Sequence, residues 1–225
     1  MLGGYAMTAI TAITAQNTLG VTGVSLIDPD MIAAQIDACT ADIGVDAVKI
    51  GMLGSAATAN VVADRLETLA VPIVFDPVMI ATSGAALADA PTIAAFHRLM
   101  ALASVVTPNL PELEALGGLA AMRNATAAVL VKGGHSEGEM VTDTLVTPKS
   151  DQSFTAPRIA TRHSHGTGCT LASAIATGLG RGEPLAVAVE RGIGFVRAAM
   201  LSAPGFGNGH GPLGHAAVIG YAPSS

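Results

Sequence analysis

The residues best suited to chemistry are HGTGCT at positions 165–170, directly before a run of small apolar residues at 171–176. Gly166 and Gly168 allow a tight turn that brings backbone N–H groups close to a ligand. The apolar run predicts a buried helix, whose first N–H groups lack partners and favour negative charge. We therefore expect a site for a phosphate or a developing anion, in a field that also stabilises a thiolate at Cys169. In isolation, such a turn is more often a loop before a core helix, with a packed cysteine.

The elements that would position this turn follow from the hydrophobic pattern. Short apolar stretches predict strands at 6–15, 46–50, 71–75, 104–107 and 127–131. Strands that alternate with helices form a mostly parallel sheet with right-handed crossovers and helices on both faces. The expected fold class is therefore α/β, and residues 1–225 are expected to form a single domain.

Polar or pocket-forming side chains follow these predicted strands, at the position where open α/β sheets carry their functional groups. Because the carboxyl ends of parallel strands share one edge, we expect six residues to gather there: Gln16, Met52, Asp76, Asn109, Glu112 and Lys132. Each has an ordinary explanation when taken alone. Gln16 could be a turn residue, and Glu112 could complement a helix dipole. Their joint occurrence favours a site.

Helices are predicted from residue 29, from residue 55 or 56, over 91–102 and over 184–201. Asp28 is a good N-cap residue and precedes a proline at the first helical position. Cys39 lies at a helical spacing that places it in the core.

Two further stretches, 142–146 and 154–159, predict antiparallel edge strands around a turn at 149–151. Between Glu112 and Val129 we expect only one helix, because 119–124 does not read as a second.

Asp76, Glu112 and Lys132 beside an anion-binding turn have the chemistry of a phosphoryl-transfer site. Such transfer depends on charge neutralisation and positioning more than on covalent steps. Lys132 can neutralise phosphate oxygens, and the two carboxylates can hold Mg²⁺ through water. Met52 and Val78 would form an apolar pocket next to them. The sequence has no Gly-x-x-x-x-Gly-Lys-Ser/Thr motif, which excludes a P-loop protein.

The composition excludes other classes of protein. The net charge is −6 and only 3% of residues are aromatic, which argues against a nucleic-acid partner. No apolar run reaches the roughly 18 residues that span a bilayer, and no signal peptide is visible, so no membrane association is expected. Cys39 and Cys169 form neither a disulfide framework nor a metal knuckle, so we expect a cytoplasmic protein.

Eight stretches in this order also carry a resemblance: TAITAITAQNT (8–18), KIGML (49–53), DPVM (76–79), SG (83–84), TPNLPE (107–112), VKGGH (131–135), HGTGCT (165–170) and GHGP (209–212). The chain resembles the hydroxymethylpyrimidine and phosphomethylpyrimidine kinases of thiamine biosynthesis over nearly its whole length. This resemblance implies a three-layer ribokinase-like fold, ATP and Mg²⁺ as cofactors and a small-molecule pyrimidine as substrate. Homodimers are common in this family.

The resemblance implies roles for the substrate-facing residues. Gln16 would hydrogen-bond the aminopyrimidine ring, with Met52 and Val78 lining the pocket. Most ribokinase-like enzymes carry Asp where this chain has Cys169, and the cysteine is typical of the pyrimidine kinases and some pyridoxal kinases. Cys169 would accept the proton of the hydroxymethyl group in a first phosphorylation. A second phosphorylation, of the monophosphate, needs little base.

Other matches imply the nucleotide and metal sites. Lys132, Asn109 and Thr170 would contact the nucleotide. Gly166, Thr167 and Gly168 would form the anion hole for the γ-phosphate. Glu112 and Asp76 would bind the magnesium ion.

The predicted function is ATP-dependent phosphorylation of 4-amino-5-hydroxymethyl-2-methylpyrimidine and then of its monophosphate. The family also has a first strand and helix, with a Gly-Gly-Ala-Gly-containing turn over the pyrimidine, and the printed sequence starts at the following strand. Two alternatives remain: a pyridoxal or pyridoxine kinase, and a catalytically weak nucleotide-binding remnant of the same fold.

Overall fold

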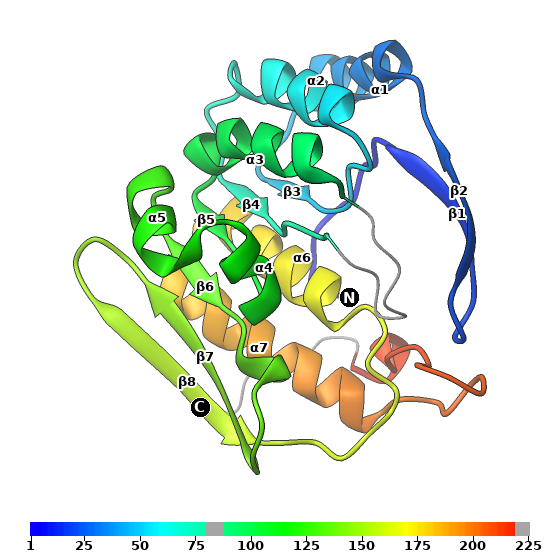
Figure 1. The fold of residues 1–225 in the computed structure, drawn as a ribbon, viewed down its shortest axis with the longest axis vertical. Helices are drawn as coiled ribbons and strands as arrows, with labels where there is room; N and C mark the ends of the chain where they lie inside the picture. Colours follow the sequence, from blue (N-terminus) through cyan, green and yellow to red (C-terminus); the bar gives the residue numbers. More distant parts are fainter. Residues whose placement is uncertain (80–87, 219–225) are drawn as a thin grey trace.

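A six-stranded sheet forms the centre of the computed structural model, which describes residues 1–79 and 88–218 (Figure 1). Across the sheet the strands are β3 (Val48–Ile50), β4 (Ile73–Phe75), β5 (Val105–Val106), β6 (Val129–Val131), β7 (Met140–Val146) and β8 (Asp151–Pro157). Strands β3 to β6 are parallel, whereas β7 and β8 run antiparallel to their neighbours. The parallel strands predicted at 46–50, 71–75, 104–107 and 127–131 are thus confirmed, as is the antiparallel pair, but of that pair only β8 forms an edge and β7 lies inside the sheet.

Helices pack on both faces of this sheet. They are α1 (Pro29–Asp42), α2 (Ala56–Leu66), α3 (Ala90–Leu102), α4 (Leu110–Ala115), α5 (Gly118–Ala125), α6 (Thr167–Gly180) and α7 (Leu185–Leu201), with short 3₁₀ turns η1 (Gly133–His135) and η2 (His215–Val218). Alternate side chains of a strand point to opposite faces. Accordingly, Ile73 and Phe75 pack in one apolar cluster with α1 to α5, and Val74 packs in a second with α6 and α7. The three layers follow from this alternation.

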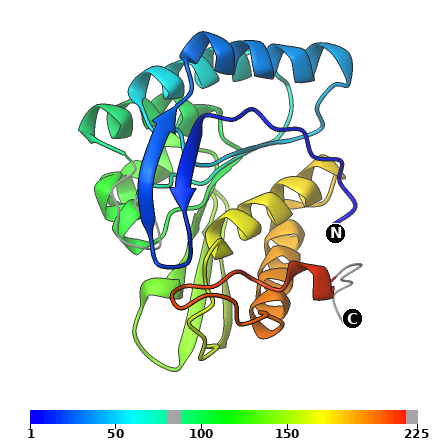
Figure 2. The same ribbon diagram turned by 90° about the vertical axis from the view of Figure 1, so that its right-hand side faces the viewer.

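The first two strands do not belong to the central sheet. β1 (Ala12–Gln16) and β2 (Val21–Leu26) form a separate antiparallel hairpin, which stands beside the central sheet in Figure 2. Its tight turn is held by Asn17, whose Oδ1 accepts hydrogen bonds from the N–H groups of Leu19 at 2.8 Å and Gly20 at 3.2 Å. The expectation that Gln16 ends a strand of the parallel sheet is therefore wrong, because this Asx-type turn folds the chain back on itself.

A second helix, α5, follows α4, contrary to the expectation for 119–124. Gly117 and Gly118 both adopt positive φ, at 89° and 80°, and so end α4 and redirect the chain into a new helix. Met122 of α5 is fully buried, and Arg123 pairs with Asp151 of β8 at 2.7 Å. Tertiary packing thus stabilises a helix of eight residues, which is too short to be stable on its own.

Local capping by a side chain accounts for the starts of α1 and α2. Asp28 accepts a hydrogen bond from the N–H of Asp30 at 2.9 Å, and Ser55 accepts one from that of Thr58 at 3.1 Å. Cys39 lies on α1 only half-buried, so its placement in the core is wrong. Among the residues the structure describes, no helix is both long and apolar enough to span a membrane.

Candidate active site

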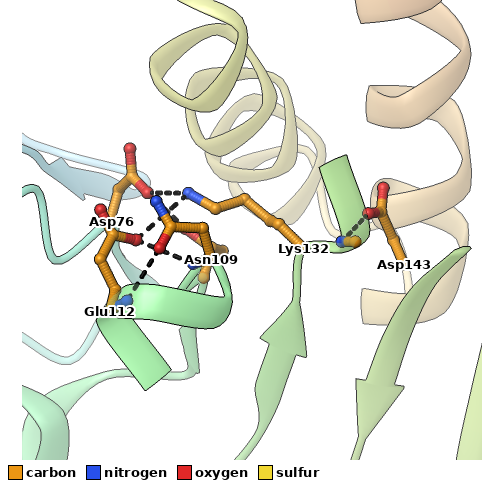
Figure 3. A network of polar contacts seen from close by, with 7 residues as sticks. Asp76, Asn109, Glu112, Lys132 and Asp143 are labelled. Carbon is orange, nitrogen blue, oxygen red and sulfur yellow. Dashed lines mark hydrogen bonds and ion pairs between the residues drawn. The ribbon is translucent and has the colours of Figure 1, made fainter. Parts of the chain in front are cut away.

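A buried ion pair lies at the carboxyl edge of the central sheet. Asp76 follows β4 and Lys132 follows β6, and the Lys132 Nζ donates to Asp76 Oδ1 at 2.7 Å (Figure 3). Thr107, which follows β5 between them, donates its hydroxyl to the same oxygen at 3.0 Å. Asp76 is only 1% exposed, so its charge depends on these two donors for compensation. The parallel order of β4, β5 and β6 brings the three residues together.

Glu112 completes this cluster from the first turn of α4. Its backbone N–H donates to Asn109 Oδ1, and its Oε2 accepts from the Asn109 N–H, both at 2.8 Å. This reciprocal pair is a capping box, so Asn-x-x-Glu positions the carboxylate by local chemistry alone. The Lys132 N–H donates to Pro108 O at 2.9 Å, which joins α4 to the end of β6. Glu112 Oε2 consequently lies 3.8 Å from Lys132 Nζ.

Helix α6 begins directly against the ion pair. Gly166 is its N-cap, with a φ of 86° that favours glycine. A Cβ atom at Gly168 would lie 3.2 Å from Lys132 Nζ and 3.5 Å from Asp76 Oδ2. Cys169, the next residue, is exposed. The structure thus brings the predicted anion-binding turn and the predicted charged cluster to one place.

The electrostatics of the cluster reflect burial opposed by pairing. Burial raises the pKa of Glu112, against the lowering effects of the Lys132 charge and the Asn109 N–H. For Lys132, burial lowers the pKa, but the negative charges of Asp76 and Glu112 and the hydrogen bond to Asp76 outweigh burial, and the net pKa is raised. Lys132 therefore stays an ammonium at neutral pH, in contact with a fully buried carboxylate.

Asp143, a residue not anticipated from the sequence, shapes the turn after Lys132. Its Oδ1 accepts a hydrogen bond from the Gly133 N–H at 2.8 Å (Figure 3). Burial raises the pKa of Asp143, against the effect of that N–H. Because Asp143 lies on β7, only the antiparallel pairing of β6 and β7 reveals this contact. Thr107 was also not predicted from the sequence as a site residue. Its position at the end of a predicted strand could have indicated that role.

The residues predicted to bind the substrate come from three places: the end of β3, the end of β4 and the hairpin. Met52 follows β3 and is half-buried, and its carbonyl accepts a hydrogen bond from Thr11 Oγ1 at 2.7 Å. Val78, also half-buried, lies two residues after Asp76. Gln16 is exposed at a register shift of the hairpin. The motif residues Ser83 and Gly84 lie outside the described residues.

Thr170 lies on the first turns of α6, where its hydroxyl has a protein partner. Thr170 Oγ1 lies 2.9 Å from His215 Nε2 of η2, and the His215 ring stacks on Phe195 of α7 with centroids 6.2 Å apart. This contact ties the chain after α7 to α6.

The described residues offer no group of three or more His, Cys, Asp or Glu side chains that could hold a metal ion.

Comparison with known proteins identifies the family and the fold. Residues 1–214 match the family model described as phosphomethylpyrimidine kinase. The chain is 43% identical over 231 residues to a hydroxymethylpyrimidine/phosphomethylpyrimidine kinase of Rhizobium meliloti, covering 95% of this chain and 87% of that one. The chain belongs to the phosphomethylpyrimidine kinase family. It is therefore a phosphotransferase, as its sequence predicted.

Solved structures agree with this assignment to the phosphomethylpyrimidine kinase family. An ADP complex of Bacillus subtilis pyridoxal kinase superposes with a TM-score of 0.86 and 28% identity, over 98% of this chain and 90% of that one. A phosphomethylpyrimidine kinase from Clostridium difficile superposes with a TM-score of 0.73 and 34% identity, over 87% of both chains. These neighbours confirm the ribokinase-like α/β fold.

Proposed function

We propose that this chain phosphorylates 4-amino-5-hydroxymethyl-2-methylpyrimidine with ATP and then phosphorylates the monophosphate to the diphosphate, in thiamine biosynthesis. The observation that carries the proposal is the approach of the α6 turn to the ion pair, with Gly168 beside Lys132 and Asp76. An anion held by the N–H groups of that turn would also be close to a buried ammonium. A transferring phosphoryl group requires both kinds of stabilisation.

Each component of the site has a distinct task in this reaction. In the first step the hydroxymethyl oxygen bonds to the γ-phosphorus, the bond from that phosphorus to the bridging oxygen breaks, and ADP leaves. The hydroxyl proton passes to the Cys169 sulfur. Gly166, Thr167 and Gly168 hold the transferred group through their backbone N–H groups. Cys169 is suited to proton transfer because it is exposed at the start of the same helix.

Nucleotide and metal are held on the other side of the turn. Lys132 and Asn109 contact the phosphates, and Thr170 approaches them from α6. Asp76 and Glu112 are the residues that would hold Mg²⁺, which supplies additional charge neutralisation when bound. Two carboxylates suit an ion that keeps several waters and takes its remaining ligands from phosphate oxygens.

The pyrimidine ring occupies the space between the hairpin and the sheet edge. Gln16 provides hydrogen bonds to the ring, and Met52 and Val78 provide an apolar floor. This arrangement is supported by the Thr11–Met52 hydrogen bond, which attaches the start of the hairpin to the end of β3. A pyridoxal ring has similar dimensions and also carries a hydroxymethyl group, and the similar Bacillus subtilis protein is a pyridoxal kinase. Pyridoxal phosphorylation is therefore the second candidate function.

One assay separates these candidates. The purified chain is incubated with ATP and Mg²⁺, with the hydroxymethylpyrimidine and pyridoxal in parallel, and ADP release is followed in each. We expect turnover on the pyrimidine and two phosphates transferred to each molecule. Turnover on pyridoxal alone would favour the second candidate. A cooperatively folded protein that is silent on both substrates would refute the proposal and support a nucleotide-binding remnant.

A further inference from the structure

A glycine-rich loop lies between the hairpin and the anion-binding turn. Residues 205–212, here called the glycine strap, connect α7 to η2, and in both ribbon views the strap lies beside the hairpin tip (Figures 1 and 2). Five of its eight residues are glycine or proline. The family function described above leaves this segment without a task.

The strap contacts the hairpin tip through Thr18. The His210 N–H donates to Thr18 O at 2.9 Å, and the Gly209 N–H points to Thr18 Oγ1 at 3.4 Å. A Cβ atom at Gly209 would collide with the Thr18 carbonyl, and one at Gly207 would collide with the Thr18 side chain. Glycine is therefore needed at both positions for the strap to approach the tip this closely.

The other side of the glycine strap contacts the segment that leads into the anion-binding turn. The His165 N–H donates to Gly211 O at 3.2 Å, and His165 and Pro212 form a parallel bridge. Ser164 Oγ lies 3.4 Å from His210 Nδ1. His210 thus contacts the hairpin with its backbone and the segment before Gly166 with its ring.

We propose that the glycine strap sets the distance between the substrate-binding hairpin and the phosphate-binding turn, with Gly209 and His210 as positioning residues. This inference rests on the proposed function, because Gln16 lies two residues from Thr18 and Gly166 directly follows His165. The hairpin is a separate sheet with mostly exposed strands, so its own packing fixes its position weakly. Reaction requires the substrate hydroxyl to be placed accurately against the phosphoryl group. The strap hydrogen-bonds to both sides, at Thr18 and at His165.

Gly209→Ala tests this inference, with Gly23→Ala as the matched control. Gly23 lies on β2 of the same hairpin, where a Cβ would meet only Ala15 Cβ at an ordinary 3.7 Å. We expect Gly209→Ala to raise the KM for the pyrimidine about tenfold or more while the KM for ATP stays within about twofold. Gly23→Ala should change neither. Equal increases in both KM values, or none, would overturn the inference.

Hydrogen exchange provides a readout that does not depend on turnover. In the nucleotide-free protein, Gly209→Ala removes the contact at Thr18. We then expect the His165 amide, which donates to Gly211 near the other end of the strap, to exchange about tenfold faster or more. Exchange that increases only within 205–212 would refute the strap even if the enzyme is active. Faster exchange at His165 in a protein silent on the pyrimidine would support the strap and count against the proposed function. His210→Ala should reproduce the effect at His165 in part, because it removes only the ring contact.

Discussion

Replacing Lys132 by Met tests whether the ammonium compensates the buried carboxylates of the site. The variant approximately keeps the length of the side chain but removes the ammonium that pairs with Asp76 and Glu112, which are 1% and 6% exposed. Removing one partner of a buried pair costs about 3–5 kcal/mol. At about 2–4 °C per kcal/mol for a domain of this size, the melting temperature should fall by about 6–20 °C near neutral pH.

The loss should also depend on pH in a defined direction. Burial raises the pKa of Glu112 in the folded protein, and the Lys132 charge opposes that rise. A carboxyl group with a raised folded-state pKa favours the folded state when it is protonated, and this contribution is lost as the pH rises through that pKa. Without the ammonium the pKa of Glu112 rises further. The deficit in melting temperature should therefore be larger at about pH 8 than at about pH 5.

Thermal unfolding followed by circular dichroism at the two pH values measures both effects. The double variant Lys132→Met, Asp76→Asn is the control, because it removes the carboxylate closest to the missing ammonium and should recover part of the lost stability. The amide can still accept the Thr107 hydroxyl that now bonds Asp76 Oδ1. A single variant that melts like the parent protein at both pH values, or a deficit that does not shrink in acid, would refute the compensation argument.

Three other substitutions separate chemistry from architecture. Cys169→Ala should slow phosphorylation of the hydroxymethylpyrimidine about 10²–10⁴-fold and affect the monophosphate step far less. Steady-state rates on each substrate measure this difference. A near-full rate on the hydroxymethylpyrimidine would show that Cys169 is not the base. Glu112→Gln should raise the Mg²⁺ concentration needed for half-maximal rate. The protein should stay folded, because the glutamine side chain can still accept a hydrogen bond from the Asn109 N–H. An unchanged Mg²⁺ titration would contradict the metal role of Glu112. Asn109→Ala removes the cap of α4 and should lower the free energy of unfolding by about 1 kcal/mol in urea titrations, and an unchanged midpoint would contradict the capping argument.

Much of the fold can be predicted from local sequence because the interactions that specify it span three or four residues. Asp28 and Ser55 cap their helices through N–H groups two and three residues away, and Asn109 and Glu112 satisfy each other across one turn. Likewise, the strands at the carboxyl edge are short apolar runs followed by polar residues. The order of these signals was sufficient to indicate the fold class and the charged residues of the site.

Two elements, the first strand and helix α5, were predicted wrongly from local sequence, and each error has a physical reason. Gln16 was assigned to the central sheet because the alternation around it is that of a strand, but alternation does not say which strand is the partner. The Asn17 turn decided that, by pairing β1 with β2. Residues 119–124 are mostly good helix formers, but they are too few to form a stable helix alone, and α5 forms because Met122 is buried between other elements.

The relations between distant residues were decided by tertiary structure alone. Lys132 meets Asp76, 56 residues earlier, because β4, β5 and β6 lie in that order in the sheet. Gly209 meets Thr18 across 191 residues because the strap crosses the hairpin tip. The sequence determined which chemical groups are present and how each is held by its immediate neighbours. Packing of the two faces of the sheet determined which groups meet, since apolar burial is non-directional and acts on the whole chain at once.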